Sequence, residues 1–402
     1  MPGGRVPARG GYPWRVAEPR RIGRDGLPSL TSLRFFAALF VVLYHLVRQV
    51  GQVTDLSMLA WFGRSGVTFF FVLSGLVLAW TYADAMPRLR VFWWRRFARI
   101  WPLHVVATLL SVGVYVVLDR PVSTAGVVAA LGLVHAWVND PTIVNGGNGA
   151  TWSLSDEAFF YLCFPLLLAG MARARDARRL ALLALAAVMA ASIALWVLVG
   201  ASVAIPTTRG WALDYFPPTR LLQFAVGVAF GLALARGWRP RVQLRSAVLA
   251  LVAYAVLLLL WREAIPETSA WGPYSASQLF AVPVFLLAVL AAASRDMEGE
   301  TGWLGSPWLI RLGHWSFAWY LVHEIVIRSL LALGGRPQGL AETAGVWLVA
   351  LVVSQALAGL LYTLVEHPTE RRLRALVGDG RQVQSEAHGT ARTETPEPLA
   401  AR

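Results

Sequence analysis

Two ionisable residues stand inside one apolar run of the sequence. Arg34 and His45 belong to S-L-R-F-F-A-A-L-F-V-V-L-Y-H-L at 32–46, a run typical of a membrane-spanning helix. Ionisable side chains are costly at that depth and usually serve a function. Eleven helical residues advance about 16 Å and return to within roughly 20° of the starting direction. The two residues should therefore share one face, with Ala38 and Val41 between them, and line a cavity with a cation at its mouth and a base near its middle.

A cluster of arginines precedes the third apolar stretch. The sequence R-R-F-A-R-I-W-P places Arg95, Arg96 and Arg99 at a helix start. The R-x-x-R spacing puts Arg96 and Arg99 on one side of a helical turn. Guanidinium groups match phosphate oxygens geometrically and keep their charge. Two interpretations stay open here: a phosphate clamp, or an ordinary membrane anchor of the kind that marks cytoplasmic loops.

Two acids enter an apolar helix in the motif T-W-S-L-S-D-E-A-F-F-Y-L at 151–162, directly after the polar stretch N-G-G-N-G. Thr151 or Ser153 is placed to cap this helix, and acids are favoured near its positive end. This interpretation fits Asp156. Glu157 is better placed to face inward, where a buried acid seeks a histidine or arginine partner.

Four further positions carry polar groups in apolar surroundings. His323, in S-F-A-W-Y-L-V-H-E, has either a helix-packing hydrogen bond or a role in a site, and Glu324 beside it is also intramembrane. Arg220 is explained by snorkelling at a membrane edge. Ser74 beside a glycine is expected to pack rather than act as a nucleophile. The V-E-H-P sequence predicts a helix stop, since Pro368 cannot continue a helix.

Other catalytic patterns are missing from the sequence. His323 and Glu324 are not followed by the second histidine of H-E-x-x-H, there is no G-x-S-x-G, and Cys163 is the single cysteine. We therefore expect no metal. The absence of lysine excludes a lysine nucleophile.

Composition predicts an all-α, polytopic membrane protein. The 402 residues are 56% hydrophobic, with a mean hydropathy of +0.54. Apolar stretches of about 20 residues recur along the chain. The predicted spans are 30–50, 64–83, 101–119, 152–170, 180–199, 217–235, 245–261, 276–293, 312–333 and 343–365. A further apolar segment, 122–138, would break the charge pattern if it crossed, so we interpret it as re-entrant or surface-lying.

Arginines concentrate in alternate connections, which predicts that both termini are cytoplasmic. The same rule accounts for much of the net charge of +13 without nucleic-acid binding. We expect a disordered basic tail at 1–28, one membrane domain at 29–370, and a basic stretch with a disordered tail at 371–402. The N-terminus lacks the features of a cleavable signal peptide.

Together these segments resemble the acyltransferase-3 family of integral membrane acyltransferases. The resemblance covers roughly residues 29–370 and keeps the family's order of motifs. The motifs are L-R-F-F-A-A-L-F-V-V-L-Y-H, G-V-T-F-F-F-V-L-S-G, R-R-F-A-R-I-W-P, T-W-S-L-S-D-E-A-F-F-Y-L, R-L-L-Q-F-A-V-G, S-F-A-W-Y-L-V-H and E-H-P.

The resemblance implies acyl transfer from an acyl-CoA, such as acetyl-CoA or another short-chain donor, to a hydroxyl group. It implies that Arg34 and His45 are the residues tied to activity. The family's R-x-x-R pair corresponds to Arg96 and Arg99, and its acid corresponds to Glu157. Acceptors in the family include polysaccharides, lipids and natural products, so polysaccharide O-acetylation and antibiotic tailoring of macrolide-type compounds are both expected. The implied location is the bacterial cytoplasmic membrane, in contact with its lipids.

The residues themselves suggest a mechanism. A buried imidazole tends to stay neutral, so His45 is expected to act as general base, with Glu157 orienting it. Arg34 would bind a CoA phosphate or stabilise the oxyanion, and its place near the cytoplasmic edge favours the phosphate. A secondary transporter with a midplane His/Glu site is the alternative.

Overall fold

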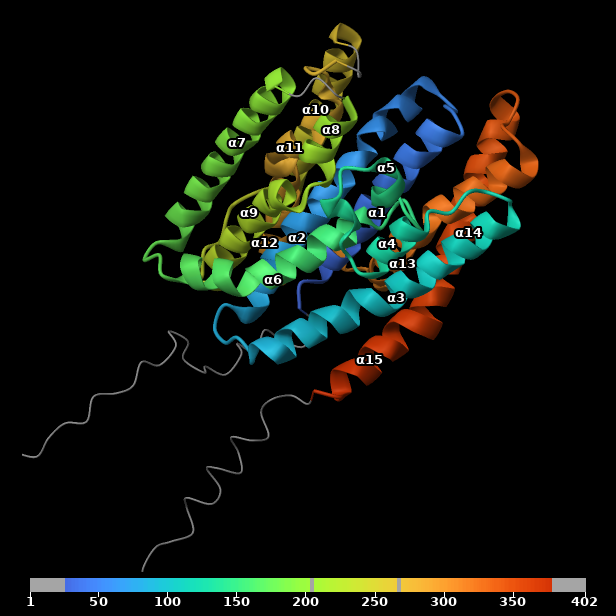
Figure 1. Ribbon diagram of the computed structural model, residues 1–402. Coiled ribbons are helices and arrows are strands. Elements are labelled where there is room, and N and C mark those ends of the chain that lie inside the picture. The colour runs from blue at the N-terminus through green and yellow to red at the C-terminus, as the bar shows by residue number, and fades with distance from the viewer. Residues whose placement is uncertain (1–25, 203–205, 266–268, 378–402) are drawn as a thin grey trace, which may run out of the picture.

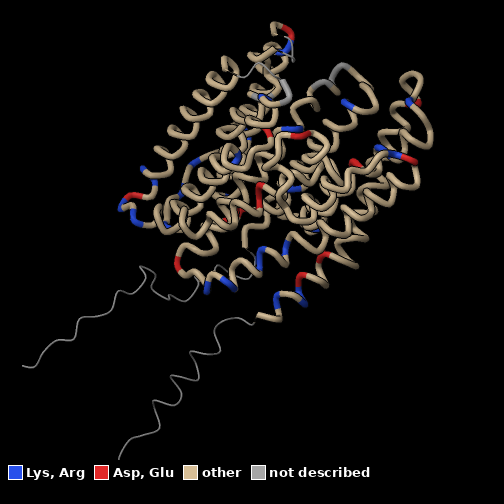
Figure 2. The backbone as a smooth tube through the Cα atoms, viewed as in Figure 1, with Lys and Arg blue, Asp and Glu red and all other residues tan. Residues whose placement is uncertain are grey.

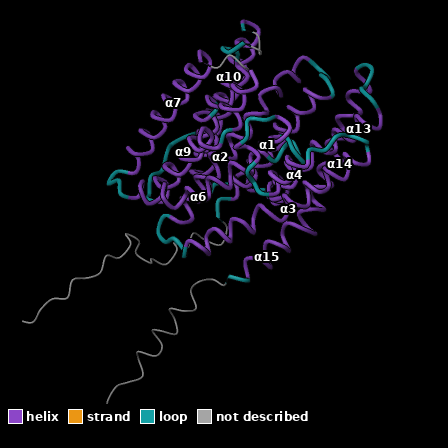
Figure 3. The backbone as a smooth tube through the Cα atoms, viewed as in Figure 1, coloured by secondary structure: helices purple, strands orange, loops and turns teal. Residues whose placement is uncertain are grey.

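The computed structural model describes residues 26–202, 206–265 and 269–377 as helices joined by loops (Figure 1), and no strand occurs in these ranges (Figure 3). The long helices are α1 (Pro28–Gln49), α2 (Gly66–Tyr82), α3 (Leu89–Val117), α6 (Trp152–Ala172), α7 (Ala177–Ser202), α9 (Pro217–Ala235), α10 (Leu244–Ala264), α12 (Val282–Glu298), α13 (Pro307–Gly334) and α14 (Leu340–Leu361). The shorter ones are α4 (Thr124–Leu131), α5 (Pro141–Val144), α8 (Pro206–Gly210), α11 (Pro273–Phe280) and α15 (His367–Ala375). Tight or wide helical turns occupy η1 (Asp55–Ser65), η2 (His135–Trp137), η3 (Trp211–Tyr215), η4 (Gly302–Gly305) and η5 (Tyr362–Glu366).

The predicted membrane bundle is confirmed. By length and composition, 10 helices of the described chain could cross a membrane, and each overlaps one of the predicted spans. The helix expected at 101–119 begins earlier, at Leu89, so the arginine cluster lies on α3 itself. The prediction missed residues 89–100 because their arginines lower the mean hydropathy, although these residues are helical.

The segment 122–138 does not form a membrane-length helix. Its α4 has 8 residues and spans only about 12 Å. Two side chains of α3 hold it: Trp101 Nε1 donates to the Leu131 carbonyl at 3.1 Å, and His104 Nε2 lies 2.8 Å from the Ala130 carbonyl. Burial lowers the pKa of His135, in η2, to about 3. The segment is thus held against α3 on one side and does not cross, while Val128 and Val134 stay 64% and 51% exposed.

The centre of the bundle is the pair α2 and α9, which pack backbone against backbone. A Cβ on Gly75 would lie 2.2 Å from the Phe224 carbonyl oxygen, and one on Gly227 would lie 2.1 Å from that of Val72. Only residues without a side chain allow this approach. The apolar stretches containing α2 and α9 are 83% and 78% buried, whereas those of α7 and α10 are 11% buried. Helices α7 and α10 therefore form the periphery.

One end of the bundle, here called the basic end, holds the start of α3 and α15. Trp94 Nε1 of α3 donates to the Leu373 carbonyl of α15 at 2.6 Å. Figure 2 shows arginines gathered along this edge. The cytoplasmic location of the termini stays a prediction. The predicted tails lie largely outside the described residues, although 371–375 continue α15.

The predicted helix stop at V-E-H-P is wrong. The chain continues from α14 through the π-turn η5 into α15, where Pro368 occupies the first turn. Proline is tolerated in a first turn because the N–H it lacks has no intrahelical partner there. Glu366 is thereby carried into the bundle, where it is 2% exposed.

Candidate active site

His45 lies in the last two turns of α1, closer to the helix end at Gln49 than to its middle. Its Nδ1 is 3.4 Å from Glu324 Oε1 and 3.0 Å from Gln49 Nε2. The side chain is 21% exposed, and Nε2 has no hydrogen-bond partner among the described residues. The Gln49 amide nitrogen can only donate, so Nε2 can take a proton only in the tautomer whose Nδ1 hydrogen points to the Glu324 carboxylate. His45 lies at one end of the bundle rather than at its centre.

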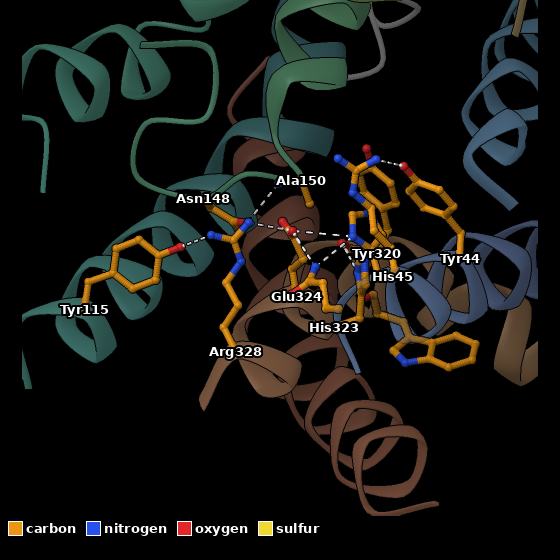
Figure 4. A network of polar contacts seen from close by, with 12 residues as sticks. Tyr44, His45, Tyr115, Asn148, Ala150, Tyr320, His323, Glu324 and Arg328 are labelled. Carbon is orange, nitrogen blue, oxygen red and sulfur yellow. Dashed lines mark hydrogen bonds and ion pairs between the residues drawn. The ribbon is translucent and has the colours of Figure 1, made fainter. Parts of the chain in front are cut away.

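Glu324 of α13 is the acid beside His45 (Figure 4). Its Oε1 accepts hydrogen bonds from Arg328 Nη2 at 2.7 Å and from Gln49 Nε2 at 3.0 Å. Arg328 also donates through Nη1 to the Tyr115 hydroxyl of α3 at 2.5 Å. A buried carboxylate with a cation and an amide on the same oxygen keeps one orientation. Side chains from α1, α3 and α13 therefore fix the carboxylate next to the imidazole.

His323 completes the polar cluster. Its ring centroid lies 5.0 Å from that of His45, and its Nδ1 is 2.7 Å from the Tyr320 carbonyl. A carbonyl can only accept, so Nδ1 carries the hydrogen and Nε2 is an acceptor. That Nε2 is buried and has no partner in the described ranges. The Tyr320 hydroxyl, in turn, lies 2.9 Å from Ser153 Oγ. His323 thus has both the packing hydrogen bond and a place in the site.

Two further cations stand near His45. Arg48 Nη1 donates to the hydroxyls of Tyr44 at 3.0 Å and Tyr274 at 2.9 Å. The guanidinium of Arg64 lies 3.5 Å from the centre of the Tyr274 ring and pairs with Asp214 at 3.0 Å. A molecule that binds beside His45 would therefore be surrounded by hydrogen-bond donors.

Glu157 does not lie beside His45, so its predicted orienting role is corrected. Its Oε1 accepts from Ser74 Oγ at 3.3 Å and from the Tyr161 hydroxyl. Glu157 follows Ser153, the α6 residue level with Tyr320, by one helical turn toward the basic end, about 6 Å along the axis. The acid that meets His45 comes instead from the H-E pair, of which the sequence analysis selected only the histidine. Ser74, expected to pack, holds Glu157.

Arg34 lies toward the basic end. It has no hydrogen-bond partner among the described residues, and its charged neighbours include Arg99, Glu366 and Glu157. Arg99 is engaged: it forms ion pairs with Glu366 and, at 3.0 Å, with Glu370. Glu366, the acid of the E-H-P motif, therefore pairs with an arginine of the cluster. The predicted helix stop gave no indication of this contact.

The other two arginines of the cluster differ in their surroundings. The Arg96 guanidinium lies 5.9 Å from the rings of both Phe92 and Tyr161, and its Nε is buried without a partner in the described ranges. Arg95 is half-buried on the same helix. Arg34 and Arg96 thus form no ion pair with a carboxylate among the described residues, unlike Arg99.

Asp156 and Arg220 are both 0% exposed, which corrects two predictions. Helix α6 has no side-chain cap, and neither carboxylate oxygen of Asp156 has a hydrogen-bond partner among the described residues. Arg220 does not snorkel: it donates to Gln278 Oε1 at 2.7 Å and to Thr68 Oγ1 at 3.3 Å. Arg220 is a charged group near Asp156, but the two side chains form no ion pair or hydrogen bond in the described ranges.

We expect Arg220→Ala to lower the stability of the protein, because the buried Gln278 Oε1 would lose its donor at 2.7 Å. The loss should be about 2 kcal/mol, measured as thermal unfolding in detergent, with exposed Arg120→Ala as the control. An unchanged unfolding midpoint in Arg220→Ala would contradict this role of the hydrogen bond.

No three His, Cys, Asp or Glu side chains gather into a potential metal site in the described ranges. The bundle thus holds a histidine–carboxylate cluster at one end and an arginine cluster at the other, inside a polytopic membrane protein. The chain belongs to the acyltransferase-3 family: residues 27–363 match the acyltransferase domain. It is therefore a membrane enzyme that transfers acyl groups.

Two curated relatives illustrate the family. Acyltransferase MdmB of Streptomyces mycarofaciens is 37% identical over 380 residues, covering 88% of this chain and 94% of the relative. O-acetyltransferase OatA of Staphylococcus aureus is 23% identical over 374 residues, covering 86% of this chain but 57% of its own length. No solved structure gives a significant match.

Proposed function

We propose that this enzyme transfers a short acyl group from acyl-CoA to a hydroxyl group, with His45 as general base. The observation that carries the proposal is the cluster of His45, Glu324, Gln49 and Arg328. A histidine with one nitrogen toward an oriented carboxylate and the other unpartnered is the arrangement that activates hydroxyl nucleophiles.

In the proposed reaction, the acceptor hydroxyl gives its proton to His45 Nε2 as its oxygen attacks the thioester carbonyl. The tetrahedral intermediate collapses, the C–S bond breaks, and the imidazolium returns the proton to the leaving thiolate of CoA. Glu324, 3.4 Å from Nδ1, stabilises the imidazolium that forms between the two steps. We assign stabilisation of the oxyanion to Arg48 and Arg64, two of the cations near His45.

We place the CoA phosphates at the basic end, on Arg34 and Arg96. The cavity wall expected along α1 is not open in this structure, since Ala38 and Val41 are 0% and 2% exposed. Helix α2 offers another path: Phe70 and Ser74 keep partial exposure although the helix is mostly buried. Phe70 faces Tyr320 of α13 at 6.2 Å, and Ser74 faces α6. We infer that the pantetheine arm follows this stripe toward His45.

For the acceptor we favour a natural product of the macrolide type over a polysaccharide or a lipid. The chain is 37% identical to MdmB of Streptomyces mycarofaciens but 23% identical to OatA. We place the enzyme in the bacterial cytoplasmic membrane with the basic end inside, because arginines collect in cytoplasmic loops.

The test is an assay of purified protein in detergent with acetyl-CoA and a panel of hydroxylated macrolides, glycans and lipids. Free thiol release and an acyl mass increment on one acceptor class are expected. Flux of a solute in proteoliposomes without thioester consumption would favour the transporter alternative and overturn the proposal.

Arg96→Ala should raise the KM for acetyl-CoA about tenfold and leave kcat nearly unchanged, because a phosphate contact contributes to donor binding rather than to the chemical step. Initial rates at varied acetyl-CoA measure this, with Arg90→Ala, exposed on the same helix, as the matched control. An unchanged KM for acetyl-CoA would favour the interpretation of the arginine cluster as a membrane anchor.

A further inference from the structure

The stretch N-G-G-N-G before α6 lies against the catalytic cluster. Asn148, 1% exposed, donates through Nδ2 to the Leu321 carbonyl of α13 at 2.8 Å (Figure 4). Leu321 stands one turn before Glu324 on the same helix. Asn148 Oδ1 also accepts from the Ala150 backbone N–H at 3.2 Å. The asparagine thus clasps the loop onto α13 and fixes the residue between these two contacts, Gly149.

Gly149 touches the carboxylate that faces His45. A Cβ on Gly149 would lie 2.7 Å from Glu324 Oε2, 3.6 Å from its Cδ and 3.3 Å from Arg328 Nη2. The other two glycines of the stretch are required for different reasons. Gly147 has a left-handed backbone with φ +73°, and Gly146 packs on the backbone of Gly126. Only Gly149 is constrained by the cluster itself.

We propose that Gly149, held by the Asn148 clasp, is a positioning residue that sets the Glu324 carboxylate toward His45. The backbone at Gly149 lies against Glu324 Oε2, whereas the Arg328 and Gln49 contacts both reach Oε1. The carboxylate is then confined between the loop and its donors. This inference rests on the proposed role of His45 and Glu324 as a catalytic pair.

The test is a cycle of Gly149→Ala, Glu324→Asp and the double variant, assayed as thiol release from acetyl-CoA. In Gly149→Ala the new methyl group must push the carboxylate aside, since the flexible end of Glu324 gives way before the backbone does. Such misplacement should lower kcat about 10- to 100-fold and leave the KM for acetyl-CoA nearly unchanged. Gly345→Ala, where nothing lies within 4 Å, is the matched control.

The double variant separates positioning from a general effect on folding. Aspartate is one methylene shorter and leaves room for the added methyl, so Gly149→Ala should cost little activity when Glu324 is already Asp. Losses that multiply instead would overturn the proposal, as would a Gly149→Ala enzyme that behaves like Gly345→Ala. Failure of the proposed function is distinguishable, because it would appear as normal turnover in a His45 variant.

Discussion

His45→Ala is expected to abolish acyl transfer while the protein still folds and inserts. Loss of the general base should lower kcat at least a hundredfold. The imidazole is 21% exposed, and its partners Glu324 and Gln49 also bind each other, so the local structure has other contacts to hold it. The measurement is thiol release from acetyl-CoA, alongside thermal unfolding and gel filtration of the same preparation.

Imidazole added to the His45→Ala enzyme should restore part of the rate, because the vacated position lies at an accessible end of the bundle. The control is His367→Ala, an exposed histidine at the basic end, which should keep normal turnover. Normal turnover by the His45→Ala enzyme would contradict the assignment of His45 as the general base. Loss of folding in that variant, with no rescue by imidazole, would reduce His45 to a packing role.

Glu324→Gln should lower kcat by roughly a hundredfold or more with little change in the KM for acetyl-CoA. The substitution keeps the size of the side chain but removes the charge that stabilises the imidazolium. It also replaces the ion pair with Arg328 at 2.7 Å by a hydrogen bond to a neutral amide oxygen, while the contact of Arg328 with Tyr115 is kept. Steady-state kinetics at saturating acceptor would measure the effect.

Glu342→Gln, an exposed acid in the first turn of α14, is the control for charge removal. Glu157→Gln provides the contrast between the two candidate acids. If Glu157→Gln lost the greater part of kcat and Glu324→Gln did not, the acid assigned from the structure would be the wrong one and the sequence-based prediction would stand.

The membrane bundle followed from the sequence because hydropathy is a local property. Each of the ten spans was recognisable on its own, and the arginine pattern kept 122–138 from being counted as another. Helical periodicity also placed Arg34 and His45 on α1 correctly relative to each other. The predicted span 30–50 ended within one residue of the observed end at Gln49, so the boundary itself already placed His45 near the helix end rather than at its middle.

The partners across helices were not predictable in the same way. Periodicity states which residues share a face but not which helix that face meets, so Glu157 was assigned to His45 in place of Glu324. A usable signal existed: Glu324 and Arg328 are an i,i+4 pair inside an apolar helix, a spacing that supports an ion pair. Gln49 is likewise four residues from His45. For Arg220, full burial became visible only once Gln278 of α11 was placed beside it.

The glycine contacts between α2 and α9 bear on how the enzyme can change shape. Gly75, Gly227 and Gly231 bring main chains so close that sliding one helix along the other would drive carbonyls into Cα atoms. We expect α2 and α9 to move together as one rigid body. If the bundle opens for a long or bulky acceptor, we expect the movement in elements outside this pair, such as the loop before α6. Spin labels on α2 and α9 should keep a fixed separation during turnover, whereas a pair on α1 and α6 should not.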